Sequence, residues 1–286
     1  MLLLSGWTGV GDDWSGFAKL CSGRDVVTYD PRGLGFSELL PSSSPPPAQS
    51  IPLLASDALQ VLRAAGVSSP PSVFGTSLGG MIGLTLASLT PLHSLHLACS
   101  TFGPHPTKQL PKPASAFFGT FSAFANDNSQ KDRAIMSAFS SSLLAPMSTT
   151  AFGRKTAASL SERFVSSRLL HGPNGTGAAI NAQLAALRKF DGWQLSESLL
   201  SSTSPPRGIS VIVGCGDAVI PPEHSRAMHE HLKSLAGSAT EIQLLETAAG
   251  SGGVQHGHFA HVTAGREVTA FVDDFDRGLR LAPVVR

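Results

Sequence analysis

The chain is poor in cysteine and in charged residues, and both shortages exclude classes of protein. Its 286 residues include three cysteines, Cys21, Cys99 and Cys215, which are widely spaced and odd in number. They form neither a disulfide framework nor a paired metal-ligand spacing, so we expect a reducing, cytoplasmic location. Charged residues make up only 14% of the chain, and the formal net charge is +1. This balance gives no electrostatic reason to expect nucleic acid or an anionic membrane as a partner.

Long apolar runs are also missing. No window of the length that a membrane span needs is free of polar residues, so no membrane span is expected. The apolar start, residues 1–6, lacks a basic region and is too short for a signal peptide. The length instead suits one large α/β domain, or a core that carries an inserted smaller domain.

The most informative stretch runs from Ser72 to Met81, where a β-branched and aromatic run meets an apolar, helix-compatible run. Between the two lies Gly75-x-Ser77-x-Gly79, a pattern typical of a nucleophile elbow in this strand-to-helix context. The glycines are needed because strand and helix pass too closely for side chains at positions 75 and 79. The turn lifts the Ser77 hydroxyl clear of the sheet. It also places the Leu78 N–H at a helix N-terminus, where it can bind an oxyanion.

Strand-like and helix-like segments alternate on both sides of this elbow, which predicts an α/β fold with a parallel sheet covered on both faces. Besides the run before Ser77, the predicted strands are residues 2–5, 25–30, 94–98, 207–214 and 241–245. The predicted helices are residues 12–21, 51–65, 81–89, 222–235 and 263–278.

Strand signals vanish between residues 101 and 204. Phenylalanine, alanine and leucine recur there with helical spacing, as in the cluster of Phe117, Phe118, Phe121 and Phe124. We therefore predict a helical cap over 101–204, inserted between the two parts of the core, 1–100 and 205–286. Its many phenylalanines and few charges predict an apolar pocket beneath it.

A serine hydroxyl needs a base, and the base needs an orienting acid. Asp217 directly follows the strand that resumes the sheet, which favours it as the acid over a simple turn residue or helix cap. The base is expected in the loop before the last helix, where His256, His258 and His261 cluster. We favour His258, with His256 as the alternative. No carboxylate or thiolate accompanies these histidines at ligand spacing, so no metal is expected.

The oxyanion requires a second donor besides Leu78. The glycine-rich loop after the first predicted strand, residues 5–9, is the natural source, and the backbone N–H of Trp7 is the candidate. The indole of Trp7 can serve at the same time as an ordinary core or pocket-wall aromatic.

Together these pieces resemble the α/β-hydrolase superfamily, in the cap-bearing group that includes the 3-oxoadipate enol-lactonases and related esterases. The matching motifs are Gly6-Trp7, Asp30-x-Arg32-Gly33-x-Gly35-x-Ser37, Gly75-Thr76-Ser77-Leu78-Gly79-Gly80, Gly214-x-Gly216-Asp217-x-x-x-Pro221 and Gly257-His258. The resemblance implies a Ser77-Asp217-His258 triad. It also implies that Asp30 and Arg32 form a structural ion pair that shapes their turn.

The chain departs from the family pattern in three places. Ser5 stands where the family usually has histidine. The chain begins at what would be the third strand, which indicates a trimmed fold or a sequence incomplete at its start. The stretch between Asp217 and His258 is longer than is typical of the family, and residues 248–253 are the expected insertion.

The identity of two residues narrows the function. Serine at position 77 argues against haloalkane dehalogenases and epoxide hydrolases, which use aspartate there. Tyr29 is the only tyrosine, so the chain cannot have the paired cap tyrosines of epoxide hydrolases. We therefore expect a cofactor-free serine hydrolase that cleaves a small apolar ester, lactone or thioester through an acyl-enzyme. The alternatives are a C–C hydrolase, an acyltransferase, an aminopeptidase or a ligand receptor that has lost turnover.

Overall fold

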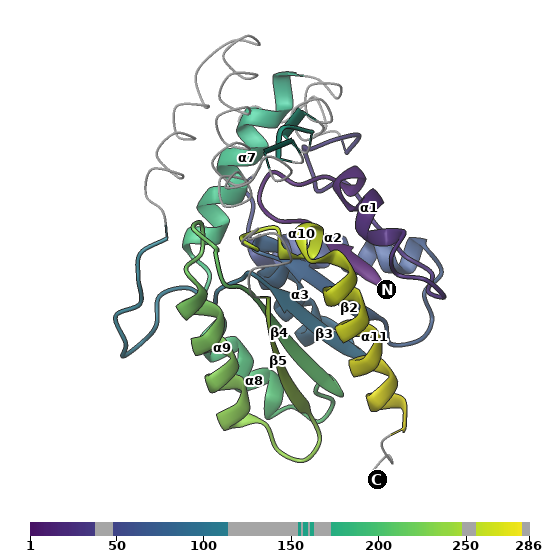
Figure 1. Ribbon diagram of the computed structural model, residues 1–286, viewed down its shortest axis with the longest axis vertical. Coiled ribbons are helices and arrows are strands. Elements are labelled where there is room, and N and C mark those ends of the chain that lie inside the picture. Colours follow the sequence, from purple (N-terminus) through teal and green to yellow (C-terminus); the bar gives the residue numbers. More distant parts are fainter. Residues whose placement is uncertain are drawn as a thin grey trace.

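The structure, a computed structural model, describes residues 1–37, 48–113, 154–155, 157–159, 161–162, 173–247 and 256–281. Within this part of the chain, five strands form one sheet in the order β1-β2-β3-β4-β5 (Figure 1). The strands are β1 (Leu2–Leu4), β2 (Ser72–Thr76), β3 (Ser94–Ala98), β4 (Gly208–Gly214) and β5 (Glu241–Thr247). All neighbouring pairs are parallel, so the carboxyl ends of the strands meet at one edge of the sheet.

The burial of each strand follows from its position. Every residue of β1, β2, β3 and β4 is buried, as expected of parallel strands that are covered on both faces. β5 lies at the edge and is mostly half-buried, which agrees with its polar residues Glu241, Gln243 and Glu246. The alternation of apolar strands and helices along the chain therefore predicted these five strands and their parallel arrangement.

Helices cover both faces of the sheet and form two separate apolar cores. The larger core lies beneath α2 (Ile51–Ala64), α3 (Leu78–Leu89), α8 (Gly192–Leu200) and α9 (Pro222–Leu235). The smaller core lies beneath the 3₁₀ helix η1 (Gly11–Trp14), α1 (Ser15–Ala18), α10 (Ala260–Thr263) and α11 (Gly265–Leu281). A further helix, α7 (Pro173–Arg188), lies above the end of the sheet near α10 (Figure 1).

Most predicted elements are confirmed, but the strand expected at residues 25–30 is wrong. That segment touches the sheet through one bridge, Leu2 with Val27, and two backbone hydrogen bonds. Past Val27 the chain turns away, because the carboxylate of Asp30 accepts hydrogen bonds from the N–H groups of Gly11 and Phe36. The predicted helix at 12–21 is divided into η1 and α1, whereas the helix predicted at 263–278 corresponds to α11, which the short helix α10 precedes.

Parts of the predicted cap are described. The segment 101–113, α7 and α8 belong to 101–204, and α8 packs against α3 and α9 of the core. The phenylalanine cluster at 117–124 and the expected insertion at 248–253 lie outside the described residues. The division into core and cap stays a prediction.

A buried polar network lies at the amino ends of the strands and joins α11 to β2 and β3. Asp276 on α11 accepts a hydrogen bond from Ser72 Oγ at 2.7 Å, forms an ion pair with Arg24 and lies 3.3 Å from His96 Nε2. Burial by itself raises a carboxyl pKa. Hydrogen bonds from His96, Ser94 and Arg24 outweigh that effect here and hold the pKa of Asp276 far below its ordinary value.

Removing this carboxylate should destabilise the protein strongly. Asp276 is 1% exposed, so Asp276→Ala leaves half-buried Arg24 and buried His96 without their common partner, which costs about 3–5 kcal/mol of unfolding free energy. Urea unfolding followed by circular dichroism measures this loss. The control is Asp273→Ala, which removes a more exposed partner of Arg24 and should cost about 1 kcal/mol or less. Equal losses in the two variants would contradict the role of Asp276.

Candidate active site

The proposed nucleophile occupies a strained backbone conformation. Ser77 lies between β2 and α3 with φ 53° and ψ −118°, and a positive φ is unfavourable for any residue with a side chain. Two hydrogen bonds from the end of β3 hold it there. The Ser77 N–H donates to Ala98 O at 2.9 Å, and Ser100 Oγ donates to Ser77 O at 2.7 Å.

The elbow glycines leave no space for side chains. A Cβ on Gly75 would lie 2.2 Å from Gly79 O, and a Cβ on Gly79 would lie 2.0 Å from Leu4 O. The second contact is with the backbone of β1, so the start of α3 packs directly on the end of that strand. This close packing allows the sharp turn that presents Ser77 at the carboxyl edge of the sheet.

The proposed acid and base meet at the same edge. Asp217 follows β4, and its Oδ1 accepts hydrogen bonds from the N–H groups of Val219 at 2.9 Å and Ile220 at 3.0 Å. Its Oδ2 lies 2.8 Å from His258 Nδ1. These bonds fix the carboxylate and orient the imidazole. Because β2 and β4 are separated only by β3, their ends lie two strand spacings apart, about 10 Å, a gap that side chains can bridge.

Close backbone packing brings the loop of His258 onto the loop of Asp217. A Cβ on Gly214 would lie 2.2 Å from Gly257 O, so only glycine allows this approach. The Gly216 N–H donates to His256 O at 2.9 Å. Cys99, which directly follows β3, also contacts the loop of His258: its Sγ lies 3.6 Å from Gly257 O.

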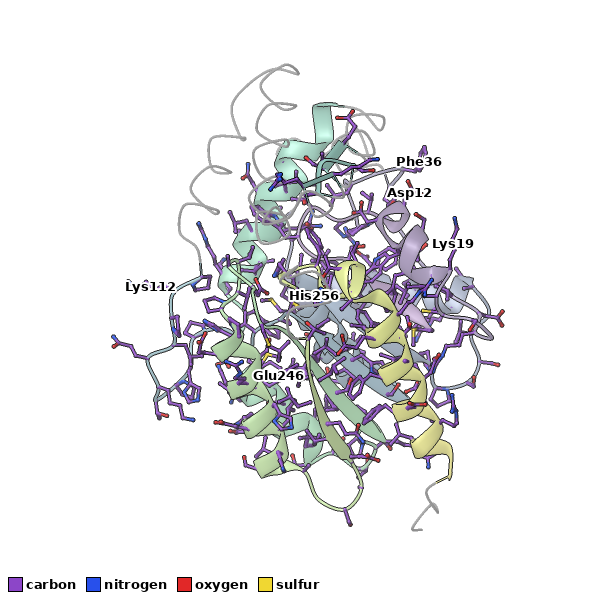
Figure 2. The ribbon with its side chains drawn as sticks, in the orientation of Figure 1. Asp12, Lys19, Phe36, Lys112, Glu246 and His256 are labelled. Carbon is purple, nitrogen blue, oxygen red and sulfur yellow. The ribbon has the colours of Figure 1, made fainter. Side chains whose placement is uncertain are left out.

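The two candidate bases have different partners. His256 lies near the centre of the view in Figure 2, beside the start of α10, and its Nδ1 lies 2.8 Å from Thr263 Oγ1. Burial lowers the pKa of His256. His258 is the histidine that reaches Asp217. Sequence spacing alone did not separate the two, because both histidines flank the same glycine.

The predicted oxyanion loop lies against the nucleophile. A Cβ on Gly6 would lie 3.3 Å from Ser77 Cβ. Ser5, the departure from the family pattern, closes the loop: its hydroxyl accepts a hydrogen bond from Trp14 Nε1 at 2.8 Å and donates to Val10 O at 3.2 Å. On the other side of Ser77, Leu78 is the first residue of α3, so its N–H lies at the helix N-terminus.

The expected ion pair between Asp30 and Arg32 is wrong. Arg32 Nε donates to Asp57 Oδ2 on α2 at 2.6 Å, in a two-pronged pair. Asp30 instead accepts backbone hydrogen bonds from Gly11 and Phe36, both at 2.7 Å. Asp30 therefore shapes the turn, whereas Arg32 connects the turn to α2 through its ion pair with Asp57.

A second serine–histidine–aspartate set, which sequence reasoning missed, is fully buried. His96 Nδ1 lies 2.8 Å from Ser210 Oγ, and His96 Nε2 lies 3.3 Å from Asp276. Ser210 and His96 are 0% exposed, at the amino half of the sheet. With no access for a substrate, this set is part of the core.

The described residues contain neither a candidate metal site nor a candidate membrane-spanning helix. No group of three or more histidine, cysteine, aspartate or glutamate side chains among them is arranged to hold a metal ion. No helix in the same residues has the length and apolar character required to cross a membrane.

The family comparison agrees with this geometry. The family model for the alpha/beta hydrolase fold matches residues 1–242. The chain therefore belongs to the α/β-hydrolase fold family, and the fold that its motifs resemble is confirmed. No curated protein matches the sequence.

Several solved structures share the fold. One is a hydrolase from Pseudomonas aeruginosa PA01, with 19% identity over 96% of this chain and 88% of that chain and a TM-score of 0.69. The enol-lactonase from Burkholderia xenovorans LB400 has 17% identity, coverages of 96% and 89% and a TM-score of 0.68. The esterase RhEst1 from Rhodococcus sp. ECU1013 has 17% identity, coverages of 97% and 90% and a TM-score of 0.67. At these identities the likeness shows the fold.

A buried histidine beside the site should make stability depend on pH. His261 on α10 packs against the rings of Trp14, Phe17, Phe74 and Phe259. Burial, followed by the charge of His258, lowers the pKa of His261 to about 3. In the unfolded chain it titrates near 6.5. Its contribution to stability is therefore fully present above about pH 6.5 and is lost as the pH falls towards 3.

The substitution His261→Phe should remove this dependence. Each pH unit below about 6.5 costs the wild type up to about 1.4 kcal/mol through this histidine, and the variant should lack that loss. Urea unfolding at several pH values between 7 and 4.5 measures both slopes. Identical slopes in wild type and variant would contradict the buried neutral histidine.

Proposed function

We propose that the protein is a cofactor-free serine hydrolase that cleaves small apolar carboxylic esters, with Ser77 as nucleophile, His258 as base and Asp217 as orienting acid. The observation that carries this proposal is the convergence at one edge of the sheet of a strained elbow serine and a histidine–aspartate pair 2.8 Å apart. Serine needs such a pair because its hydroxyl is a poor nucleophile when protonated.

In the proposed first step, Ser77 Oγ attacks the ester carbonyl while His258 Nε2 takes the hydroxyl proton. Asp217 accepts the Nδ1–H bond, which keeps the imidazole in the required tautomer and stabilises its charged form. The N–H groups of Leu78 and Trp7 hold the oxyanion. His258 then gives the proton to the departing alcohol, and an acyl-enzyme remains.

In the second step, His258 removes a proton from water, which attacks the acyl-enzyme carbonyl. Collapse of the second tetrahedral intermediate breaks the bond to Ser77 Oγ and releases the carboxylic acid. His258 returns the proton to Ser77, and both proton transfers use the same imidazole nitrogen.

The surroundings support a small apolar substrate. Ser77 and His258 are only 6% and 7% exposed, so the site is largely shielded from bulk water. Val219, Ile220 and Ile180 are buried apolar residues on the acid loop and α7. The esterase and enol-lactonase names of similar solved structures agree with ester or lactone cleavage.

Ser77→Ala should abolish ester hydrolysis. Without the hydroxyl no acyl-enzyme forms, so kcat for a short-chain p-nitrophenyl ester should fall by at least about 10³-fold. Release of p-nitrophenol measures turnover, and circular dichroism checks that the variant is folded. Wild-type turnover retained in the variant would refute the proposal.

Covalent labelling by a fluorophosphonate separates an active site from an inert one. Labelling of wild type at Ser77 without hydrolysis of the test esters would identify a competent nucleophile with a different acyl substrate. A folded wild type with neither labelling nor hydrolysis would favour a ligand receptor and overturn the proposed hydrolase.

The two histidines should respond differently to substitution. His258→Ala removes the proposed base, whose Nδ1 lies 2.8 Å from Asp217 Oδ2, and should lower kcat by about 10³-fold or more. His256→Ala removes a hydrogen bond to Thr263 and should change kcat by less than about tenfold. The same p-nitrophenyl ester assay compares them. The reverse ranking would make His256 the base.

A further inference from the structure

α7 contacts the oxyanion loop at two consecutive residues. Trp7 Nε1 donates to Ile180 O at 2.8 Å, and the Thr8 N–H donates to the side-chain Oε1 of Gln183 at 3.4 Å. Ile180 and Gln183 are three residues apart and share one face of the helix. Figure 1 shows α7 above the end of the sheet at which α10 lies. α7 therefore holds the loop from the side opposite the strands.

The loop residue that Gln183 contacts is conformationally strained. Thr8 has φ 68° and is 0% exposed. The other described non-glycine residues with positive φ are Ser77 and Cys99, which also lie at this edge of the sheet. Thr8 directly follows Trp7, whose backbone N–H is the proposed oxyanion donor. Because a strained residue keeps its conformation only when its surroundings fix it, the contact with Gln183 bears directly on that donor.

Gln183 is an unusual residue for its position. It is 0% exposed, and its Nε2 has no hydrogen-bond partner in the part of the chain that the structure describes. A buried amide NH₂ without an acceptor destabilises a fold, so an apolar side chain of the same shape would pack at least as well. The feature of glutamine that an apolar residue lacks is Oε1, and this atom faces Thr8.

We propose that Gln183 is a positioning residue for the oxyanion hole: its Oε1 fixes the Thr8 peptide and thereby aims the Trp7 N–H at the developing oxyanion. This inference rests on the proposed hydrolase function. It assigns to Gln183 a contribution to the rate of the chemical step. The loop is then fixed at three points, by Ser5, by the Trp7 indole and by Gln183.

Three variants test this role. Gln183→Met keeps the shape but removes the acceptor, so kcat should fall roughly 10- to 100-fold, somewhat less than the loss of an oxyanion donor itself. KM should change little, because the contact does not involve the bound substrate. Gln183→Glu keeps an oxygen towards Thr8 and should retain most of the wild-type kcat. The control is Gln60→Met, the same change at an exposed position of α2, which should leave kcat unchanged.

Stability provides a second, independent measurement. Gln183→Met removes the unpartnered buried amide, so its thermal midpoint should equal or exceed that of wild type although its kcat is lower. A merely structural contact would lower the midpoint and leave kcat intact. A trifluoromethyl ketone, which forms a tetrahedral adduct with a catalytic serine, should bind Gln183→Met more weakly by the same factor as kcat/KM falls.

The outcomes distinguish this inference from the proposed function. An active wild type with an unchanged kcat in Gln183→Met overturns the role of Gln183 alone. A kcat loss in Gln183→Met that Gln183→Glu does not restore also overturns it. A folded wild type without turnover and without fluorophosphonate labelling overturns the proposed function, and the oxyanion role of Gln183 is overturned with it.

Discussion

The positive φ of Ser77 is the constraint on which the rest of the site depends. A residue with a side chain adopts this conformation only if neighbouring elements fix it. Ala98 at the end of β3 and Ser100 just after it hold the backbone of Ser77, and the start of α3 packs on β1. The parallel sheet is therefore part of the proposed site, because it sets the backbone geometry of Ser77 and places the ends of β2 and β4 two strand spacings apart.

The polar groups of the core divide between the two ends of the sheet. At the amino ends, Asp276 interacts with Arg24, Ser72 and His96, so its carboxylate joins α11 to the sheet. At the carboxyl ends, His258 meets Asp217 beside the elbow, and buried His261 stays neutral in an aromatic setting. Similar residue types therefore form a core network at one end of the sheet and the proposed catalytic group at the other.

Backbone contacts, more than side chains, define the shape of the proposed site. At Gly214 and at Gly79 a backbone carbonyl lies so close that a Cβ would collide with it. The proposed oxyanion loop is held by hydrogen bonds of Ser5 and by a hydrogen bond from the Trp7 indole to α7. These contacts join segments far apart in sequence. In the proposed mechanism, a substitution at any of them displaces an oxyanion donor or the base without touching a substrate. The packing of these loops therefore matters to the proposed site as much as the residues of the proposed triad.

The sequence by itself determined the features that depend on local pattern. Burial on both faces and sharp turns restrict the residues allowed at each position, so the strands β2, β3 and β4, the turn at Ser77 and the place of Asp217 after β4 were predictable. Only the tertiary structure decided which groups meet. It paired Arg32 with Asp57, reduced 25–30 to a single bridge, brought His258 to Asp217 and placed Gln183 beside Thr8. Such contacts depend on how loops pack in three dimensions, and the spacing of residues along the chain does not predict that packing.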